Sequence, residues 1–279
     1  MGTPKFDIVM KDLEVGYGDK VIVGGINVTL PAEKISVILG GSGCGKSTLL
    51  KHLLKLHPAI SGAISIAGHD ISTLSAGDWS CLKLRLGLLF QDGALLGSLT
   101  LGDNIALPLR EHTRMDKRRV AEVVQAKLGL VGLAEAAGLY PNQLSGGMRK
   151  RGGLARAMVM DPKVLFCDEP TSGLDPINSA ELDQLLLELN RRFGITIVIV
   201  SHDLASMRAI ADHVVVLGEG RVLFDGPAEE LERTEDPYLR RFLDRLAEQR
   251  STPRLTQPPL EQSLFKRDCA HFWEGSREP

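Results

Sequence analysis

The chain has 279 residues, of which 43% are hydrophobic and 24% charged, so it has enough apolar side chains for a sizeable core. Its 33 basic and 35 acidic residues give a net charge of −2, which excludes a strong overall attraction to nucleic acid or to an anionic membrane. The cysteines are too scattered for a metal or disulfide framework, and the longest apolar run, residues 195–200, is too short to span a bilayer. The N-terminus lacks the apolar run of a signal peptide, which favours a cytosolic chain that needs a partner for any work at a membrane.

The first part of the chain predicts strands followed by a glycine loop. Residues 6–30 indicate short strands that are broken by Gly16, Gly18 and the Gly24-Gly25 pair. Residues 34–39 are an apolar and β-branched run of the kind buried in a parallel sheet. A glycine-rich stretch and a helical pattern over 47–56 follow directly, and this order predicts the opening of a phosphate-binding α/β fold.

The middle of the chain, from about residue 99 to 160, predicts helices without a strand between them. The pattern is helical over 117–128 and 149–160. Short apolar runs then return at 163–167, 195–200 and 214–217. With right-handed crossovers these runs predict a mainly parallel α/β sheet into which the middle segment is inserted as a helical subdomain.

The C-terminal part predicts one more helix and then a tail. An amphipathic helix is expected over 236–250, with Leu239, Phe242, Leu243 and Leu246 on one face. Beyond Ser251 the composition shifts to Pro, Gln and Ser, which is typical of a tail rather than a domain. We therefore expect one domain over 1–250 and a tail over 251–279.

One segment matches a phosphate-binding pattern at every fixed position. Gly40-Gly41-Ser42-Gly43-Cys44-Gly45-Lys46-Ser47 fits G-x-x-x-x-G-K-[ST], between a buried strand and a helix, which argues against a chance glycine loop. Its backbone N–H groups and the helix N-terminus would surround the phosphates of ATP. We expect Lys46 to reach the β- and γ-phosphates, Ser47 to bind Mg²⁺, and Thr48 to belong to the nucleotide site.

Two carboxylates end the predicted strand at 163–167. Asp168 would lie at the edge of the sheet opposite the phosphate loop, where it could hold Mg²⁺ through water. Glu169 would then orient or deprotonate the attacking water. An acidic pair after a strand is weak evidence for such a site by itself, and it becomes strong evidence in a chain that also has a phosphate loop.

The segment Leu144-Ser145-Gly146-Gly147-Met148 resembles the signature sequence of ABC ATPases. Other motifs of that family follow in order over about residues 6–235: Tyr17 resembles the aromatic residue that stacks on adenine, Gln91 the Q-loop glutamine, Ser172-Gly173-Leu174-Asp175 the D-loop, and His202 the switch histidine. The resemblance implies an antiparallel N-terminal β subdomain beside the parallel sheet.

The same resemblance implies that two copies pack head to tail, with Ser145, Gly146 and Gly147 of one copy closing over the ATP of the other. The residues implied in catalysis are Lys46, Gln91, Glu169 and His202, and those implied at Mg²⁺ are Ser47, Gln91 and Asp168. Asp175 joins the nucleotide site through the D-loop.

Several stretches are similar to a narrower group, the ATPases of Mla-type transporters that move phospholipid between bacterial envelope membranes. They are residues 89–95, residues 103–113, and Met148 where most relatives carry Gln. This similarity implies a permease dimer, an Mce-domain protein and possibly a STAS-domain subunit as partners, at the cytoplasmic face of the inner membrane. The alternatives are an importer of another solute, a soluble ABC ATPase of DNA repair or translation, and an inactive scaffold.

Three features depart from the pattern or stay open. Gly152 and Gly153 fall inside a predicted helix, which indicates either a closely packed backbone or a soft helix, and we expect Gly153→Ala to be tolerated. Cys44 lies at a helix N-terminus, a setting that lowers the pKa of a thiol, although a small residue there needs no regulatory role. The basic runs at 117–119 and 149–151 are typical of solvated helix faces.

Overall fold

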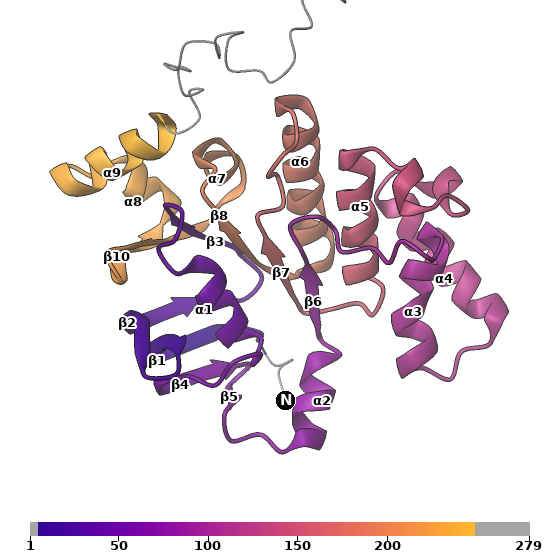
Figure 1. The fold of residues 1–279 in the computed structure, drawn as a ribbon, viewed down its shortest axis with the longest axis horizontal. Helices are drawn as coiled ribbons and strands as arrows, with labels where there is room; N and C mark the ends of the chain where they lie inside the picture. Colours follow the sequence, from indigo (N-terminus) through magenta and orange to yellow (C-terminus); the bar gives the residue numbers. More distant parts are fainter. Residues whose placement is uncertain (1–4, 249–279) are drawn as a thin grey trace, which may run out of the picture.

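Two β-sheets and a set of helices form residues 5–248, the part of the chain that the computed structural model describes (Figure 1). The predicted tail at 251–279 lies outside the described residues. The strands are β1 (Ile8–Tyr17), β2 (Lys20–Leu30), β3 (Ile35–Gly40), β4 (Ser61–Ile66), β5 (His69–Asp70), β6 (Leu86–Leu89), β7 (Val164–Asp168), β8 (Thr196–Ser201), β9 (His213–Gly218) and β10 (Arg221–Pro227). The helices are α1 (Lys46–Leu53), α2 (Ala76–Lys83), α3 (Leu101–His112), α4 (Lys117–Leu130), α5 (Gly146–Ala157), α6 (Pro176–Phe193), α7 (Leu204–Ile210), α8 (Ala228–Glu232) and α9 (Pro237–Glu248), with 3₁₀ turns η1 (Ala134–Ala136) and η2 (Pro141–Gln143).

The larger sheet has six strands in the order β10-β9-β3-β8-β7-β6. Neighbours from β9 to β6 run parallel, and only the edge strand β10 pairs antiparallel. Every residue of β3 and β8 is buried, because helices or the second sheet cover both faces, as apolar β-branched runs require. The predicted mainly parallel sheet is confirmed; β6 and β10, which are short or partly exposed, were not predicted.

The smaller sheet contains the N-terminal strands in the order β2-β1-β4-β5 and is antiparallel. The expectation of several short strands over 6–30 is wrong, since β1 and β2 have 10 and 11 residues. Gly16 and the Gly24-Gly25 pair lie within these strands, and register shifts in the β1–β2 pairing absorb them. Only Gly18 occupies the turn between the two strands.

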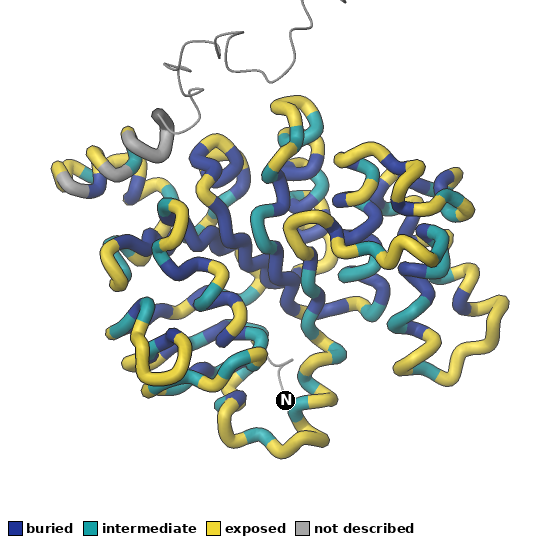
Figure 2. The backbone as a smooth tube through the Cα atoms, viewed as in Figure 1, coloured by how far each residue is buried: buried dark blue, intermediate teal, exposed yellow. Residues whose placement is uncertain are grey.

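Two hydrophobic cores lie on the two faces of the six-stranded sheet. Figure 2 shows the buried segments of the chain in dark blue. Successive side chains of a strand point to opposite faces, so Ile38 and Leu39 belong to different cores. The first core joins the smaller sheet to α1 and includes Phe166, which is fully buried. The second is covered by helices α3 to α9, whereas α2 packs against the first. Full burial of a large apolar side chain such as that of Phe166 stabilises the fold by about 1.5–3 kcal/mol.

Helices α3, α4 and α5 form the insertion between β6 and β7. Side chains at their N-caps set where they start: Thr100 accepts from the backbone N–H of Asp103, and Asp116 accepts from that of Arg119. The fully buried Asn104 donates to the carbonyl oxygens of Leu96, Leu99 and Thr100 and so shapes the segment that enters α3. The predicted insertion of helices into the sheet is confirmed.

Helix α9 continues the chain along the second core. The carboxylate of Asp236 accepts from the N–H of Leu239 at 2.9 Å, so the helix starts where the sequence predicts. Leu239 is buried and Leu243 packs against the same core, whereas the side chains of Phe242 and Leu246 are outside the described part. Within residues 5–248, no helix combines the length and the hydropathy that a membrane span needs.

Gly153 packs against the backbone of another segment, and this corrects the expectation that Gly153→Ala is tolerated. A Cβ atom at this position would lie 2.7 Å from Cα and 2.8 Å from the carbonyl oxygen of Gly93. At Gly152 the nearest atom, at 2.6 Å, is the end of the Leu101 side chain rather than backbone. The first of the two predicted alternatives, a closely packed backbone, therefore holds at Gly153.

We expect Gly153→Ala to destabilise the protein by about 1–3 kcal/mol, because overpacking against backbone forces α5 and the segment at Gly93 apart. Gly129 of α4 is the matched control, since a Cβ there meets nothing within 4 Å. Gly129→Ala should stabilise by about 0.4–1 kcal/mol through helix propensity. Thermal or denaturant unfolding of both variants measures the difference; an equal rise in stability would contradict the close contact.

Candidate functional site

The glycine loop connects the buried strand β3 to helix α1. Gly45 has φ 105°, a conformation that L-residues avoid, and a Cβ there would lie 2.4 Å from the Val23 side chain. Helix α1 begins at Lys46 without a side-chain cap, which leaves its first N–H groups available to an anion. The buried Lys46 donates from Nζ to the carbonyl oxygens of Gly40 at 2.9 Å and Gly41 at 3.0 Å, so its charge lies inside the loop.

Glu169, Lys46 and His202 meet directly beside this loop. One carboxylate oxygen of Glu169 lies 3.9 Å from Lys46 Nζ, and the other lies 2.8 Å from Nδ1 of His202. The Glu169 side chain is 15% exposed, while that of His202 is 47% exposed. A carboxylate that is mostly shielded from water, beside a cation and an accessible imidazole, can orient a water molecule and accept its proton.

Asp168 carries a buried oxygen atom without a partner. Among the described residues, its Oδ1 is one of three buried side-chain polar atoms that make no hydrogen bond. Burial raises the pKa of this carboxyl, and the neighbouring charge of Glu169 raises it further. Such an atom lacks the compensation that burial requires and is suited to a cation that is supplied with the ligand.

The oxygen atoms of Ser47, Asp168 and Gln91 fit the preference of Mg²⁺ for hard oxygen ligands, few of which come from protein when phosphates supply the rest. Within residues 5–248, no group of three His, Cys, Asp or Glu side chains forms a metal cluster by itself. The unpartnered oxygen of Asp168 is the observation that supports a cation here.

Gln91 and the D-loop segment lie in contact. Gln91 follows β6 and donates from Nε2 to the hydroxyl of Ser172 at 3.3 Å. Asp175 caps α6, where its carboxylate accepts from the N–H groups of Ile177 and Asn178, both at 3.0 Å. These backbone bonds, with that of Asn178 as the largest cause, lower the pKa of Asp175.

Tyr17 lies at the end of β1 with its side chain available to a ligand. It is 46% exposed, and its ring meets that of His57 edge to face, with centroids 5.3 Å apart. Lys51 of α1 lies over the ring and its Nζ is 3.4 Å from the Tyr17 hydroxyl. Hydrogen bonds from Thr48 and Lys51 lower the pKa of this hydroxyl. The position beside α1 suits a base that extends from the phosphate loop.

The Ser145 loop belongs to a second, separate part of the candidate site. Ser145 caps α5 by accepting from the N–H of Met148 at 3.2 Å, and Gly147 lies against the Asn178 side chain next to Asp175. Helices α1 and α5 lie on either side of β7 and α6 (Figure 1). The structure therefore brings together Gly40–Thr48, Asp168, Glu169 and His202. Gln91 and Asp175 lie further along the same edge of the sheet. Ser145, Gly146 and Gly147 lie apart from the phosphate loop of their own chain.

Cys44 does not have the lowered pKa that its place at a helix N-terminus predicts. It is half-buried, and burial raises the pKa of its thiol more than the charge of Lys46 lowers it. Its Sγ packs close to Gly40, where a Cβ would be 2.4 Å away. The thiol therefore acts as a small packing group of the loop.

Two cations of α5 were missed as parts of this region. Lys150 was expected on a solvated face but is 5% exposed and binds the loop after Glu169. Arg156 donates to the carbonyl oxygens of Gly93 and Ala94. The spacing of Gly147, Lys150 and Gly153 places them on one helix face, a signal that could have indicated burial. The other basic run, 117–119, is exposed as predicted.

Comparison with known proteins gives one family throughout. The family model described as "ABC transporter" matches residues 23–172. The chain is 43% identical over 237 residues to the probable ribonucleotide transport ATP-binding protein mkl of Mycobacterium tuberculosis, a match that covers 85% of the chain but only 66% of that relative. It is 39% identical over 239 residues to the intermembrane phospholipid transport system ATP-binding protein MlaF of Escherichia coli, covering 86% of the chain and 89% of MlaF.

Solved structures agree with this result. CbiO1 of Clostridium perfringens, part of the ABC transporter complex cbiONQ, superposes with a TM-score of 0.76 at 29% identity, over 88% of this chain and 96% of that one. The ATP-binding cassette MJ0796, a dimer in a post-hydrolysis state bound to ADP and Pi, superposes with a TM-score of 0.72 at 28% identity, over 79% and 98%. Both superpose over nearly their whole length, so this chain shares their fold.

We expect Asp168→Asn to raise the melting temperature of the nucleotide-free chain at pH 7. The pKa of Asp168 is raised in the folded state, so its protonated carboxyl stabilises the fold. This stabilisation is fully present below the unfolded pKa and is lost as the pH rises through the folded pKa. At pH 7 Asp168 has lost this stabilisation, whereas the amide introduced by Asp168→Asn stays neutral. The gain in melting temperature should therefore shrink as the pH falls toward the unfolded pKa of Asp168, near 3.8.

Asp175→Asn is the matched control, because its pKa is shifted in the opposite direction. Its carboxylate stabilises the fold above its unfolded pKa, and the substitution should lower the melting temperature at pH 7 or leave it unchanged. Melting curves of both variants at several pH values provide the measurement. Equal losses of stability in both variants would argue against a buried, uncompensated Asp168.

Proposed function

Because the chain belongs to the ABC transporter family of ATP-binding proteins, we propose that it is the ATP-hydrolysing motor of a transporter for phospholipid in the bacterial envelope. The observation that supports hydrolysis is the contact of Glu169 with Lys46 and His202 beside the phosphate loop. The observation that favours lipid as the cargo is the identity of 39% to MlaF over 89% of its length.

The phosphate loop binds ATP through backbone N–H groups and the start of α1. When ATP enters, Lys46 exchanges the carbonyl oxygens of Gly40 and Gly41 for the β- and γ-phosphates, which is a short movement for a flexible side chain. Tyr17 offers its exposed ring to adenine. The loop thus holds the nucleotide before any chemistry begins.

Glu169 positions the attacking water at the γ-phosphate and takes its proton. His202 donates to the opposite oxygen of the same carboxylate and so fixes the direction in which Glu169 points. Ser47, Asp168 and Gln91 would hold Mg²⁺, which would supply positive charge to neutralise the phosphates. Placement and electrostatics together account for the rate increase in this kind of reaction.

Two copies complete each site. The Ser145 loop lies away from the phosphate loop of its own chain, and a helix N-terminus beside small residues is suited to bind a γ-phosphate. In a head-to-tail pair, Ser145, Gly146 and Gly147 of one copy close over the ATP of the other, and Asp175 lies at the same junction. This arrangement places two nucleotides in the interface.

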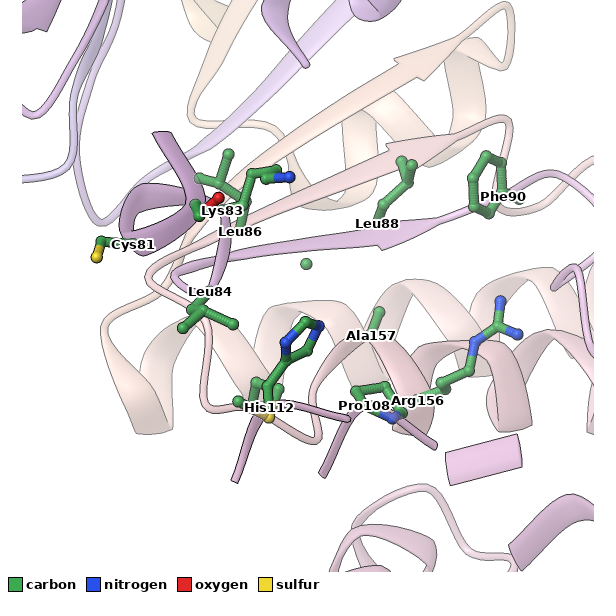
Figure 3. Close-up of a pocket in the computed structure, with 13 residues that line it drawn as sticks. Cys81, Lys83, Leu84, Leu86, Leu88, Phe90, Pro108, His112, Arg156 and Ala157 are labelled. Atoms are coloured by element: carbon green, nitrogen blue, oxygen red, sulfur yellow. The ribbon is translucent and has the colours of Figure 1, made fainter. Parts of the chain in front are cut away.

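The pocket shown in Figure 3 is a suitable docking surface for a membrane permease. The pocket lies between β6 and the helices of the insertion, and its labelled side chains include Leu84, Leu88, Phe90 and Pro108. Phe90 is 44% exposed and directly precedes Gln91. A cytoplasmic loop of the permease that fills this pocket would sense the state of the nucleotide site through Gln91.

The remaining partners and the location are proposed from the resemblance of residues 89–95 and 103–113 to Mla-type ATPases. We place the chain at the cytoplasmic face of the inner membrane, bound to a permease dimer, with an Mce-domain protein and possibly a STAS-domain subunit in the assembly. We also propose an ATPase domain over 1–250, a helical subdomain over about 99–160 and a tail over 251–279.

A second cargo class has its own support. The identity to mkl, whose name states ribonucleotide transport, is 43%, although the chain spans only 66% of that protein. The first experiment is to express the tagged chain with its genomic neighbours and to analyse the purified complex for proteins, lipids and nucleotides. A permease, an Mce-domain protein and enriched phospholipid support lipid transport; a permease with a solute-binding protein and no lipid favours another cargo; no membrane protein favours a soluble ATPase.

Glu169→Gln should lower kcat for ATP hydrolysis by about 10²–10⁴-fold, because the amide keeps the shape of the side chain and cannot take a proton. Binding of ATP should remain, since Lys46 and the phosphate loop are unchanged. The control is Glu232→Gln on α8, an exposed carboxylate paired with Arg208, which should leave kcat unchanged. Hydrolysis at the wild-type rate by Glu169→Gln would remove this residue from the mechanism.

Leu84→Glu should abolish co-purification with the permease, because a charge in the apolar pocket opposes docking. Leu56→Glu is the control, since Leu56 is 61% exposed and does not line this pocket. Affinity purification of each tagged variant from co-expressing cells measures the difference. Equal recovery of permease with both variants would place the docking surface elsewhere.

A further inference from the structure

Lys150 of α5 is a buried cation that binds one backbone loop with its whole ammonium group. It is 5% exposed, and its Nζ donates to the carbonyl oxygens of Glu169 at 3.4 Å, Pro170 at 2.7 Å and Ser172. A lysine has three hydrogens to donate, so this loop engages all of them. Lysine is rarely buried without such compensation, which indicates a specific role for the contact.

The loop that Lys150 binds carries the carboxylate next to the phosphate site. Glu169 has φ 48°, a left-handed conformation that is uncommon for a residue with a side chain and must be held by its surroundings. Its N–H donates to the carbonyl of Val200 at 2.9 Å, while its own carbonyl accepts from Ser172 N and from Lys150. Both sides of the residue are thereby fixed, and the direction of its carboxylate toward Lys46 and His202 follows.

The same helix also holds the segment that contains Gln91. Gly153 packs on the backbone of Gly93, and Arg156 donates to the carbonyl oxygens of Gly93 and Ala94 at 3.1 and 2.8 Å. Burial lowers the pKa of Lys150, and the negative charges of Asp92 and Glu169 act in the opposite direction. Lys150 thus lies between the Gln91 segment and the Glu169 loop.

Helix α5 begins at Ser145, the cap of the loop that faces the second copy. Lys150 lies five residues later, which is about 7.5 Å along the helix axis at 1.5 Å per residue. A displacement of the Ser145 loop along this axis must move the ammonium group as well. Because Lys150 and its bond to the Pro170 carbonyl are buried, water cannot easily replace this bond if a sliding helix breaks it.

We propose that Lys150 is a positioning residue that couples the Ser145 loop to Glu169 of the same chain. When that loop closes on the nucleotide of the second copy, α5 carries Lys150 with it and sets the Glu169 loop in its active position. Hydrolysis in one site then depends on whether the chain has engaged the other site. This inference rests on the proposed ATPase function and extends it to the communication between the two sites.

The test compares Lys150→Met, Lys150→Gln and Lys150→Arg in the full chain purified with its membrane partners. For Lys150→Met we expect kcat to fall by about 10–100-fold while KM for ATP changes by less than about twofold, because a misplacement near 1 Å affects chemistry more than binding. Lys150→Gln keeps two donors, so its kcat should lie between those of Lys150→Met and the wild type. Lys150→Arg keeps the charge and the donors and should recover part of the lost kcat.

Lys127→Met is the matched control for the loss of a buried lysine. Lys127 of α4 is 9% exposed and pairs with the carboxylate of Asp161, which belongs to neither half of the candidate site. The Lys127→Met substitution should lower thermal stability without changing kcat by more than about twofold. Melting temperatures of all variants separate loss of folding from loss of positioning, and Lys150→Gln and Lys150→Arg keep the test valid if Lys150→Met does not fold.

Two results would overturn the inference separately from the proposed function. If the wild-type complex hydrolyses ATP and the folded Lys150 variants keep its kcat, Lys150 has no positioning role and the ATPase proposal stands. If Lys127→Met lowers kcat as much as Lys150→Met, the effect is a general loss of stability. A wild-type complex that does not hydrolyse ATP overturns the proposed function and the positioning role together.

Discussion

The parallel register of four neighbouring strands is the constraint on which the candidate site depends. Strands β3, β8, β7 and β6 pair so that Leu39 lies beside Ser201, Asp168 beside Val200, and Leu89 beside Cys167. All four strands therefore end at one edge of the sheet, and whatever follows each of them comes together there. The phosphate loop, His202, Glu169 and Gln91 follow these strands in turn, from segments that are far apart in the sequence. A slip in register would separate the groups while leaving each motif intact.

The candidate site is divided between two separate parts of the chain, the phosphate loop and the Ser145 loop. Helix α5 packs on the insertion side of the sheet, so the Ser145 loop at its start cannot share a nucleotide with the phosphate loop of the same chain. The contacts of Lys150, Gly153 and Arg156 nevertheless tie this helix to the Glu169 loop and to the segment after Gln91. In the proposed head-to-tail pair, these contacts would connect the half of the site that binds the nucleotide of the second copy to the half that binds its own.

Several local features lower stability and are concentrated where chemistry is proposed. Asp168 has a buried oxygen without a partner, and Glu169 has a left-handed backbone. Lys46 holds a buried charge that it shares with the carbonyl oxygens of its own loop. Each is unfavourable in isolation, and a ligand with phosphate groups and a cation would compensate the first and the third. The two hydrophobic cores on either side of the sheet supply the stability that these features remove.

The sequence by itself determined the class of fold, the phosphate loop, the acidic pair after β7 and the family, because these depend on local patterns whose spacing along the chain is strict. It did not determine how long β1 and β2 are, since cross-strand pairing and register shifts carried them through glycines that are local breakers. It also assigned Lys150 to a solvated surface, and it could not show that burial raises the pKa of the Cys44 thiol, because composition and helix position say nothing about burial. Only the tertiary structure decided that Gly153 needs to be a glycine and that Lys150 binds the Glu169 loop. Both depend on which distant backbone packs against one face of α5, and that packing is a property of the whole fold.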